Sequence, residues 1–208
     1  RYNPGGAIDN AVYLSSLITG QFNDEIFCSD QWNSEIQEFW LNNNPENLIR
    51  RFQTYENSLF LNKIYILTSR STASASELVI NSLNPYIDVI HIGEITYGKY
   101  QGSLTLYDSE NFSFENINPT HNYALQPLVF KILNAVGNTD YYDGLQPDYL
   151  LQEFPANMGE IGDESEPLLN FALDLINSKE ITSIRSSPVN FFDDNFRFEH
   201  LNKEMYIE

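Results

Sequence analysis

Two short apolar runs, at residues 63–68 and 86–92, stand out from the more polar sequence around them. Both have the length and the β-branched content of buried strands. Between them, the apolar residues over 73–83 recur at the spacing of a helix. A strand, a helix and a second strand in this order form a βαβ-like unit. The pattern therefore predicts an α/β fold.

Weaker patterns extend this prediction in both directions. A tight turn is expected at 3–6, Asn-Pro-Gly-Gly, followed by a helix from residue 7 that stops at Gly20. The alternation at 103–107 and the apolar content of 124–133 indicate further strands. An amphipathic helix is expected at 167–176, with loops at 93–102 and 138–147.

Two segments lack a clear period. Residues 21–60 are rich in asparagine, glutamate and aromatic residues, which predicts helical pieces and loops, and we interpret the segment as an insertion. The tail at 183–208 shows no regular spacing. We therefore expect one domain at 1–182 and a C-terminal extension at 183–208. The chain opens on Arg1, without a methionine and in a sequence typical of a strand's end, so we expect the domain to be truncated at its N-terminus.

Composition narrows the range of partners. The 208 residues suffice for one substantial domain, and 11 basic against 29 acidic residues give a net charge of −18. Such a surface repels phosphates and anionic lipids, so we expect no nucleic-acid partner. The single cysteine, Cys28, excludes a disulfide framework and a cysteine-based zinc site. We expect no metal and no cofactor, because the loop at 138–144 lacks the ligand spacing of a calcium site.

The first candidate for chemistry is the segment 71–77, Ser-Thr-Ala-Ser-Ala-Ser-Glu, which joins the first predicted strand to the helix. Backbone N–H groups in the first turn of a helix have no intrahelical partner and carry the positive end of the helix dipole. They can stabilise an oxyanion that develops on a substrate carbonyl beside a serine nucleophile. A purely structural interpretation also fits, because Ser74 and Glu77 match a capping box.

The second candidate is Lys99, in the loop Thr-Tyr-Gly-Lys-Tyr-Gln-Gly at 96–102. A lysine acts as a general base only when it is neutral near pH 7. Its pKa must then fall from about 10.4 by roughly three, which costs on the order of 4 kcal/mol. Aromatic and glycine neighbours favour such an environment, and the nearest acid in the sequence is Glu94. The structural alternative is a surface lysine on a turn.

Three sequence blocks, at 1–6, 72–77 and 93–99, together resemble the carboxy-terminal processing (tail-specific) protease family of Ser/Lys peptidases. Their order matches the family, and so does the interval from Ser74 to Lys99, which selects Ser74 among the neighbouring hydroxyls. A later segment, Asp-Gly-Leu-Gln-Pro-Asp at 143–148, resembles the family segment that closes the core. The resemblance covers about residues 1–150.

The resemblance implies a serine endopeptidase with a crotonase/Clp-protease-like core of curved mixed sheets flanked by helices. Ser74 would attack the scissile carbonyl and form an acyl-enzyme, with Lys99 as general base. The backbone N–H groups of Gly5, Gly6 and Ala75 would line the oxyanion hole.

The resemblance is incomplete at the third catalytic position. The family has a lysine-orienting glutamine four residues after the lysine, where this chain has Ser103; either Gln101 or Ser103 is the candidate here. The family also implies a PDZ-like domain before Arg1, a protein or peptide substrate, and a periplasmic or other extracytoplasmic location. It leaves the oligomeric state open.

Two other functions compete with the peptidase. A non-catalytic ligand-binding protein on the same fold would leave the Ser/Lys pair unused, and a carboxylate paired with Lys99 would favour it. An acyl-thioester enzyme of the crotonase class would need a nucleotide pocket, for which the chain offers few cations. A Ser-His-Asp triad has little support, because His91 fits a packed strand and His121 and His200 lack a plausible partner.

Overall fold

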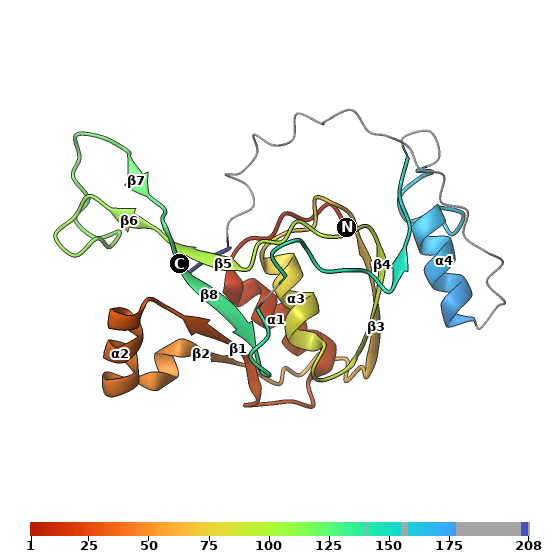
Figure 1. Ribbon diagram of the computed structural model, residues 1–208, viewed down its shortest axis with the longest axis horizontal. Helices are drawn as coiled ribbons and strands as arrows, with labels where there is room; N and C mark the ends of the chain where they lie inside the picture. Colours follow the sequence, from red (N-terminus) through yellow and green to blue (C-terminus); the bar gives the residue numbers. More distant parts are fainter. Residues whose placement is uncertain (140, 155–157, 178–204, 208) are drawn as a thin grey trace.

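Figure 1 shows the computed structural model, which describes residues 1–139, 141–154, 158–177 and 205–207. Its main sheet has the strand order β10-β5-β8-β1-β2. The sheet is mixed, since β10 and β5 are parallel and the other neighbours are antiparallel. Its strands are β1 (Ile26–Gln31), β2 (Ile49–Arg51), β5 (Gln101–Leu104), β8 (Leu128–Asn134) and β10 (Met205–Ile207).

The second sheet contains the predicted βαβ unit. Strands β3 (Lys63–Thr68), β4 (Asp88–Gly93) and β9 (Tyr149–Leu150) are all parallel. Helix α3 (Ala75–Leu83) connects β3 to β4, so the strand–helix–strand prediction is confirmed. A small hairpin of β6 (Leu106–Tyr107) and β7 (Ala124–Leu125) projects from the body of the molecule (Figure 1).

The helices follow the sequence signals closely in most places. Helix α1 (Ile8–Thr19) ends at Gly20, whose φ of 74° gives the left-handed cap that glycine adopts without strain. Helix α4 (Pro167–Ile176) has the predicted bounds, with the proline in its first turn. The other helices are α2 (Ser34–Asn43) and the 3-10 helix η1 (Pro45–Leu48).

The core lies between the two sheets, where α1 and α3 pack (Figure 1). Ile8 of α1 and Leu78 of α3 are buried with Phe27 of β1, and each such side chain contributes about 1.5–3 kcal/mol relative to exposure. Helix α4 covers the opposite face of the second sheet and buries Leu168 against Ile92. The layers are therefore sheet, helices, sheet and helix. This arrangement confirms the predicted α/β class, with mixed and curled sheets flanked by helices.

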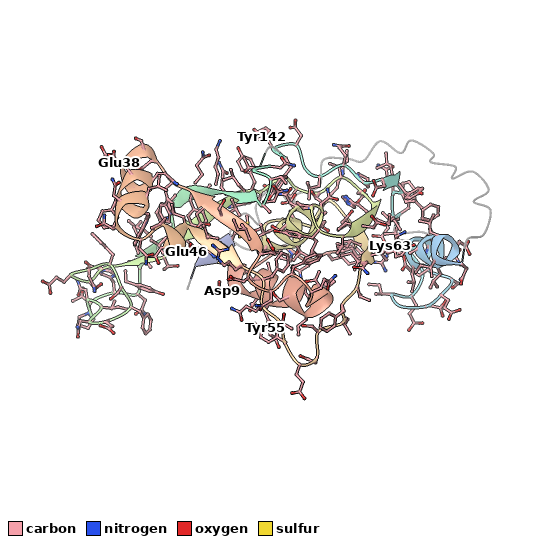
Figure 2. All side chains as sticks on the ribbon, turned by 90° about the horizontal axis from the view of Figure 1, so that it is seen from below. Asp9, Glu38, Glu46, Tyr55, Lys63 and Tyr142 are labelled. Atoms are coloured by element: carbon pink, nitrogen blue, oxygen red, sulfur yellow. The ribbon has the colours of Figure 1, made fainter. Side chains whose placement is uncertain are left out.

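The molecule is elongated along this stacking direction. In Figure 2, Glu38 of α2 and Lys63 of β3 lie toward opposite sides of the core, while Asp9 of α1 lies between them. Among the described residues, no helix is long and apolar enough to cross a membrane.

The prediction of only helical pieces and loops for 21–60 is wrong. Strand β1 pairs with both β2 and β8 and is therefore an interior strand of the main sheet. Its sequence lacks apolar alternation because it buries Asp30, whose carboxylate pairs with Arg50 at 2.7 Å. That 21–60 is an insertion stays a prediction.

The other differences are smaller. The single strand expected at 103–107 is divided, since β5 ends at Leu104 and β6 begins at Leu106. Most of the proposed extension at 183–208 lies outside the described residues, but Met205–Ile207 forms β10 beside β5. His91 is a buried strand residue as expected. Burial lowers its pKa to about 4, and its Nε2 lies 2.6 Å from the Thr68 hydroxyl.

Candidate active site

Ser74 occupies a strained turn directly before α3. Its φ of 62° and ψ of −124° are unusual for a residue with a side chain, and such conformations cost on the order of 1–3 kcal/mol. The side chain is fully buried, and its hydroxyl has no hydrogen-bond partner among the described residues. An unpaired buried hydroxyl in a strained turn is typical of a functional rather than a purely structural serine.

The glycine turn at the start of the chain packs on this serine. A Cβ atom at Gly5 would lie 2.6 Å from Ser74 Cβ and 2.8 Å from Ala75 N, so only glycine fits there. The Gly5 N–H donates to Asn3 Oδ1 at 2.9 Å, whereas a Cβ at Gly6 would meet nothing within 4 Å. Gly5 thus lies beside Ser74 and Ala75, and Gly5, Gly6 and Ala75 line one cavity.

Glu77 connects the serine turn to the lysine loop. Its Oε2 accepts the Ser74 N–H and the Lys99 N–H, each at 2.8 Å. Because both nitrogens lie 2.8 Å from the same oxygen, Ser74 N and Lys99 N can be no further apart than twice 2.8 Å. Its Oε1 accepts the Thr96 hydroxyl at 2.5 Å and the Gly98 N–H at 2.6 Å. One carboxylate thus holds both segments that the sequence singled out.

This carboxylate is fully buried and is held by neutral donors. Burial raises the pKa of Glu77, while the hydrogen bonds from Thr96, Gly98, Lys99 and Ser74 favour the ionised form. The capping-box arrangement of Ser74 and Glu77 is present, and Glu77 accepts the Ser74 N–H at 2.8 Å. The Ser74 hydroxyl itself makes no hydrogen bond within the described residues.

Close backbone packing fixes the loop that carries Lys99. A Cβ at Gly98 would collide with the carbonyl oxygen of Tyr142, and its φ is 92°. Lys99 is half-buried and lines a cavity of about 520 Å³ together with Gln101 and Asp143. The segments at 93–102 and 138–147, both predicted as loops, therefore pack against each other around this lysine.

The two candidate lysine-orienting residues differ in position. Gln101 lines the same cavity as Lys99. Ser103 is fully buried and donates to the Met205 carbonyl at 2.8 Å, on the side of β10. A register irregularity separates Gly102 from Ser103 in the pairing with β8. The geometry favours Gln101 over Ser103 as the neighbour of Lys99.

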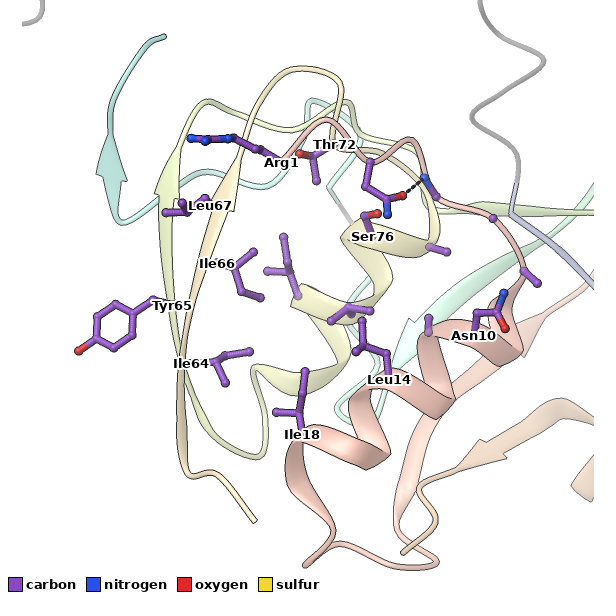
Figure 3. A pocket seen from close by; sticks show the side chains of 18 residues that line it. Arg1, Asn10, Leu14, Ile18, Ile64, Tyr65, Ile66, Leu67, Thr72 and Ser76 are labelled. Carbon is purple, nitrogen blue, oxygen red and sulfur yellow. Dashed lines mark hydrogen bonds between the residues drawn. The ribbon is translucent and has the colours of Figure 1, made fainter. Parts of the chain in front are cut away.

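Another cavity, of about 510 Å³, opens beside the glycine turn (Figure 3). One wall is formed by Ile64 and Ile66 of β3, and the opposite wall by Leu14 and Ile18 of α1. Gly5, Gly6 and Ala75 lie at its edge. The predicted oxyanion donors therefore border an apolar space.

Sequence reasoning missed the second role of Glu77 and all of the role of Thr96. The capping-box motif accounted for Glu77 locally, and nothing in the pattern indicated its contacts with 96–99. Cys28 is excluded as a nucleophile, because it is fully buried in β1 and burial raises the pKa of its thiol.

Comparison with known proteins decides the family. The model of peptidase family S41 matches residues 1–150. The chain belongs to peptidase family S41. The predicted resemblance to carboxy-terminal processing proteases is thus confirmed at the level of the family.

Solved structures place this S41 chain among longer proteins. The chain is 27% identical to a Bacteroides fragilis NCTC 9343 protein assigned to the S41 proteases, with a TM-score of 0.69. The match covers 86% of this chain and 43% of the Bacteroides protein. A Parabacteroides merdae ATCC 43184 protein assigned as a peptidase is 14% identical, with a TM-score of 0.54 and coverage of 85% and 49%. The latter shows the fold alone. No curated protein matches the chain.

Proposed function

We propose that this S41 chain carries the catalytic centre of a serine endopeptidase, with Ser74 as nucleophile and Lys99 as general base. The observation that supports it most is the shared acceptor, Glu77 Oε2, which holds the backbone of both residues at 2.8 Å. A serine hydroxyl and a lysine amine on adjoining backbones can reach each other through their side chains.

In the proposed reaction, the Lys99 amine takes the proton of the Ser74 hydroxyl as Oγ adds to the scissile carbonyl. The N–H groups of Gly6 and Ala75 stabilise the oxyanion, since the Gly5 N–H already donates to Asn3. The protonated lysine gives its proton to the leaving amine, and an acyl ester remains on Ser74. Water, deprotonated by Lys99, then adds to the ester carbonyl. The lysine returns the proton to Ser74 Oγ as the ester bond breaks and the acid is released.

Gln101 is our candidate for the residue that orients Lys99. It shares the cavity of the lysine, and its amide oxygen can accept a hydrogen bond from the ammonium or amine. A Gln101→Ala variant should lose activity, whereas a Ser103→Ala variant should alter β10 packing and leave the pH profile of the reaction unchanged.

Access to the serine requires movement. The Ser74 side chain is fully buried, and Gly5 packs directly on it. A substrate carbonyl can therefore reach Oγ only when the turn at 3–6 or a neighbouring segment is displaced. We propose that peptide binding makes this displacement.

The test is cleavage of unstructured protein and peptide substrates by the full-length protein and three variants. Ser74→Ala, Lys99→Ala and Lys99→Arg should each lower kcat/KM by about 10⁴-fold or more while the protein remains folded. The arginine variant fails because a guanidinium stays protonated. Activity retained in any folded variant contradicts the assignment and favours the non-catalytic ligand-binding alternative.

The cellular setting is also a proposal and rests on the family. We propose an extracytoplasmic location and a PDZ-like domain that delivers protein substrates to this core. Fractionation of cells that express the full-length protein tests the first, and retention of cleavage after deletion of such a domain would contradict the second.

A further inference from the structure

A second, smaller hollow adjoins the cavity of Lys99. It has a volume of about 260 Å³, and Gln101 and Leu128 line both spaces. These two residues therefore stand at the passage from the lysine to the hollow. Neither Ser74 nor the proposed oxyanion donors Gly6 and Ala75 line this hollow.

The hollow has an apolar floor and a polar rim. Phe130 is buried, and Trp32 and Val129 are half-buried. The ring centroids of Trp32 and Phe130 lie 4.9 Å apart, with the ring planes tilted by 38°, and together they form an aromatic surface. The exposed side chains of Gln31 and Lys131 stand at the rim.

The strand register gives the separation between the hollow and the lysine. Gln101 of β5 pairs with Lys131 of β8, which pairs with Gln31 of β1, so Trp32 lies two strands away from β5. Because β1 and β5 run in the same direction, Trp32 lies level with Gly102, three residues further along the sheet than Lys99. With strands about 4.8 Å apart and about 3.3 Å per residue along β5, the distance from Lys99 to Trp32 is roughly 14 Å. An extended peptide spans that distance in about four residues.

We propose that this hollow is a substrate subsite that binds an apolar, preferably aromatic, side chain of the peptide, about four residues from the residue that lies beside Lys99. The inference rests on the proposed function and names the substrate class: extended peptides with a bulky apolar residue at that separation from the cleaved bond. The passage through Gln101 and Leu128 carries the peptide backbone from one space to the other.

The chain offers a matched control, because its two tryptophans differ in place. Trp32 lines the hollow, whereas Trp40 lies on α2 against Phe39 with ring centroids 5.1 Å apart. Trp32→Ala and Trp40→Ala each remove an indole side chain, from two different places in the fold. Only the first removes the floor of the proposed subsite.

The first experiment measures cleavage specificity in the full-length protein. Peptides of alanine and glutamine carry a single phenylalanine at each position, up to five residues on either side of the cleaved bond. The wild type and Trp40→Ala should prefer phenylalanine at one position about four residues away. Trp32→Ala should lose that preference, with kcat/KM for the preferred peptide lowered by about 10-fold or more. Identical position profiles in Trp32→Ala and the wild type would overturn the subsite.

The second experiment separates this inference from the proposed function. In a Ser74→Ala, Trp40→Phe protein, Trp32 is the remaining tryptophan of the 208 residues. The part of the fluorescence signal that a further Trp32→Phe change removes reports binding without cleavage. A shift with the phenylalanine peptide, but not with the all-alanine-and-glutamine peptide, supports the subsite even if the wild type cleaves nothing. No shift, or an equal shift with both peptides, overturns it even if Ser74 and Lys99 prove catalytic.

Discussion

Helices α3 and α4 each begin beside a fully buried glutamate, Glu77 and Glu166, and the two carboxylates bind different kinds of partner. Glu166 precedes α4, accepts the N–H groups of Leu168 and Leu169, and binds Arg1 Nη1 at 2.6 Å. Glu77, in the first turn of α3, has no such cation among the residues that the structure describes, and it binds neutral donors from two separate segments. The first is a cap with an ion pair. The second holds two loops at a fixed separation.

The electrostatic consequences are opposite. Burial alone would raise the pKa of Glu166, but the hydrogen bond from Arg1 and the backbone N–H groups outweigh it, so the pKa is lowered. At Glu77 burial prevails over the neutral donors, and the pKa is raised. The contrast teaches that a buried carboxylate without a cation is a costly way to start a helix, and is therefore a marker of function.

The largest expected effect is on activity. Glu77→Gln replaces one accepting oxygen with an amide that cannot accept, which should shift the Ser74 turn relative to the Lys99 loop. Because small misplacements of reacting groups are costly, kcat/KM should fall by about 100-fold or more. Glu166→Gln should leave peptide cleavage within about threefold of wild type. Equal activities in the two folded variants would contradict a functional difference between Glu77 and Glu166.

The next effect is on stability. Glu166→Gln removes the charge that faces Arg1, a side chain that is itself buried, and should lower the free energy of unfolding by about 3 kcal/mol. Glu153→Gln should cost less, because Glu153 is the more distant partner of Arg1, at 3.0 Å. Urea unfolding at pH 7 measures both. Equal losses would mean that the two carboxylates share the guanidinium evenly.

The pH dependence of unfolding should separate the glutamates by sign. The pKa of Glu166 is lowered, so its stabilisation is present above its ordinary pKa of 4.5 and is lost as the pH falls below that value. The pKa of Glu77 is raised, so its contribution is greatest below 4.5 and declines as the pH rises through its folded pKa. Each glutamine variant should remove its own dependence from unfolding curves measured between pH 3 and pH 8. Slopes of the same sign would refute the contrast.

The smallest effect concerns backbone strain at the two helix starts. Ser74 has a φ of 62°, whereas Glu166 has an unstrained φ of −65°. Ser74→Gly should therefore be more stable than Ser74→Ala by about 1 kcal/mol, since glycine relieves the strain. At position 166 glycine should be no better than alanine by this mechanism. Thermal unfolding of the four variants, with glycine or alanine at position 74 and glycine or alanine at position 166, gives the comparison.

Much of the candidate site was predictable because its signals are local. The glycine turn, the serine before α3 and the glycine-bordered Lys99 each stand in a short recognisable segment. The role of Glu77 was not, because its additional donors lie at 96–99, after an intervening strand. A residue explained by its own helix gives no sign of a contact made by tertiary packing.

The same limit applies to the fold. Strands β3 and β4 could be predicted from their apolar runs, since helices bury both faces of the sheet that contains them. Strand β1 did not, because a buried ion pair at Asp30 replaces an apolar side chain in the middle of the strand. Strand β10 pairs with a partner far away in the chain, and no local pattern encodes such a pairing.

That last pairing has a consequence for how the molecule is made. Residues 205–207 align with Gly102–Leu104, and Met205 is fully buried in the main core. The ribosome must synthesise residues 205–207 before the sheet beside Gln101 is complete. Until then, a nascent chain carries an unpaired edge on β5, directly after the loop that holds Lys99.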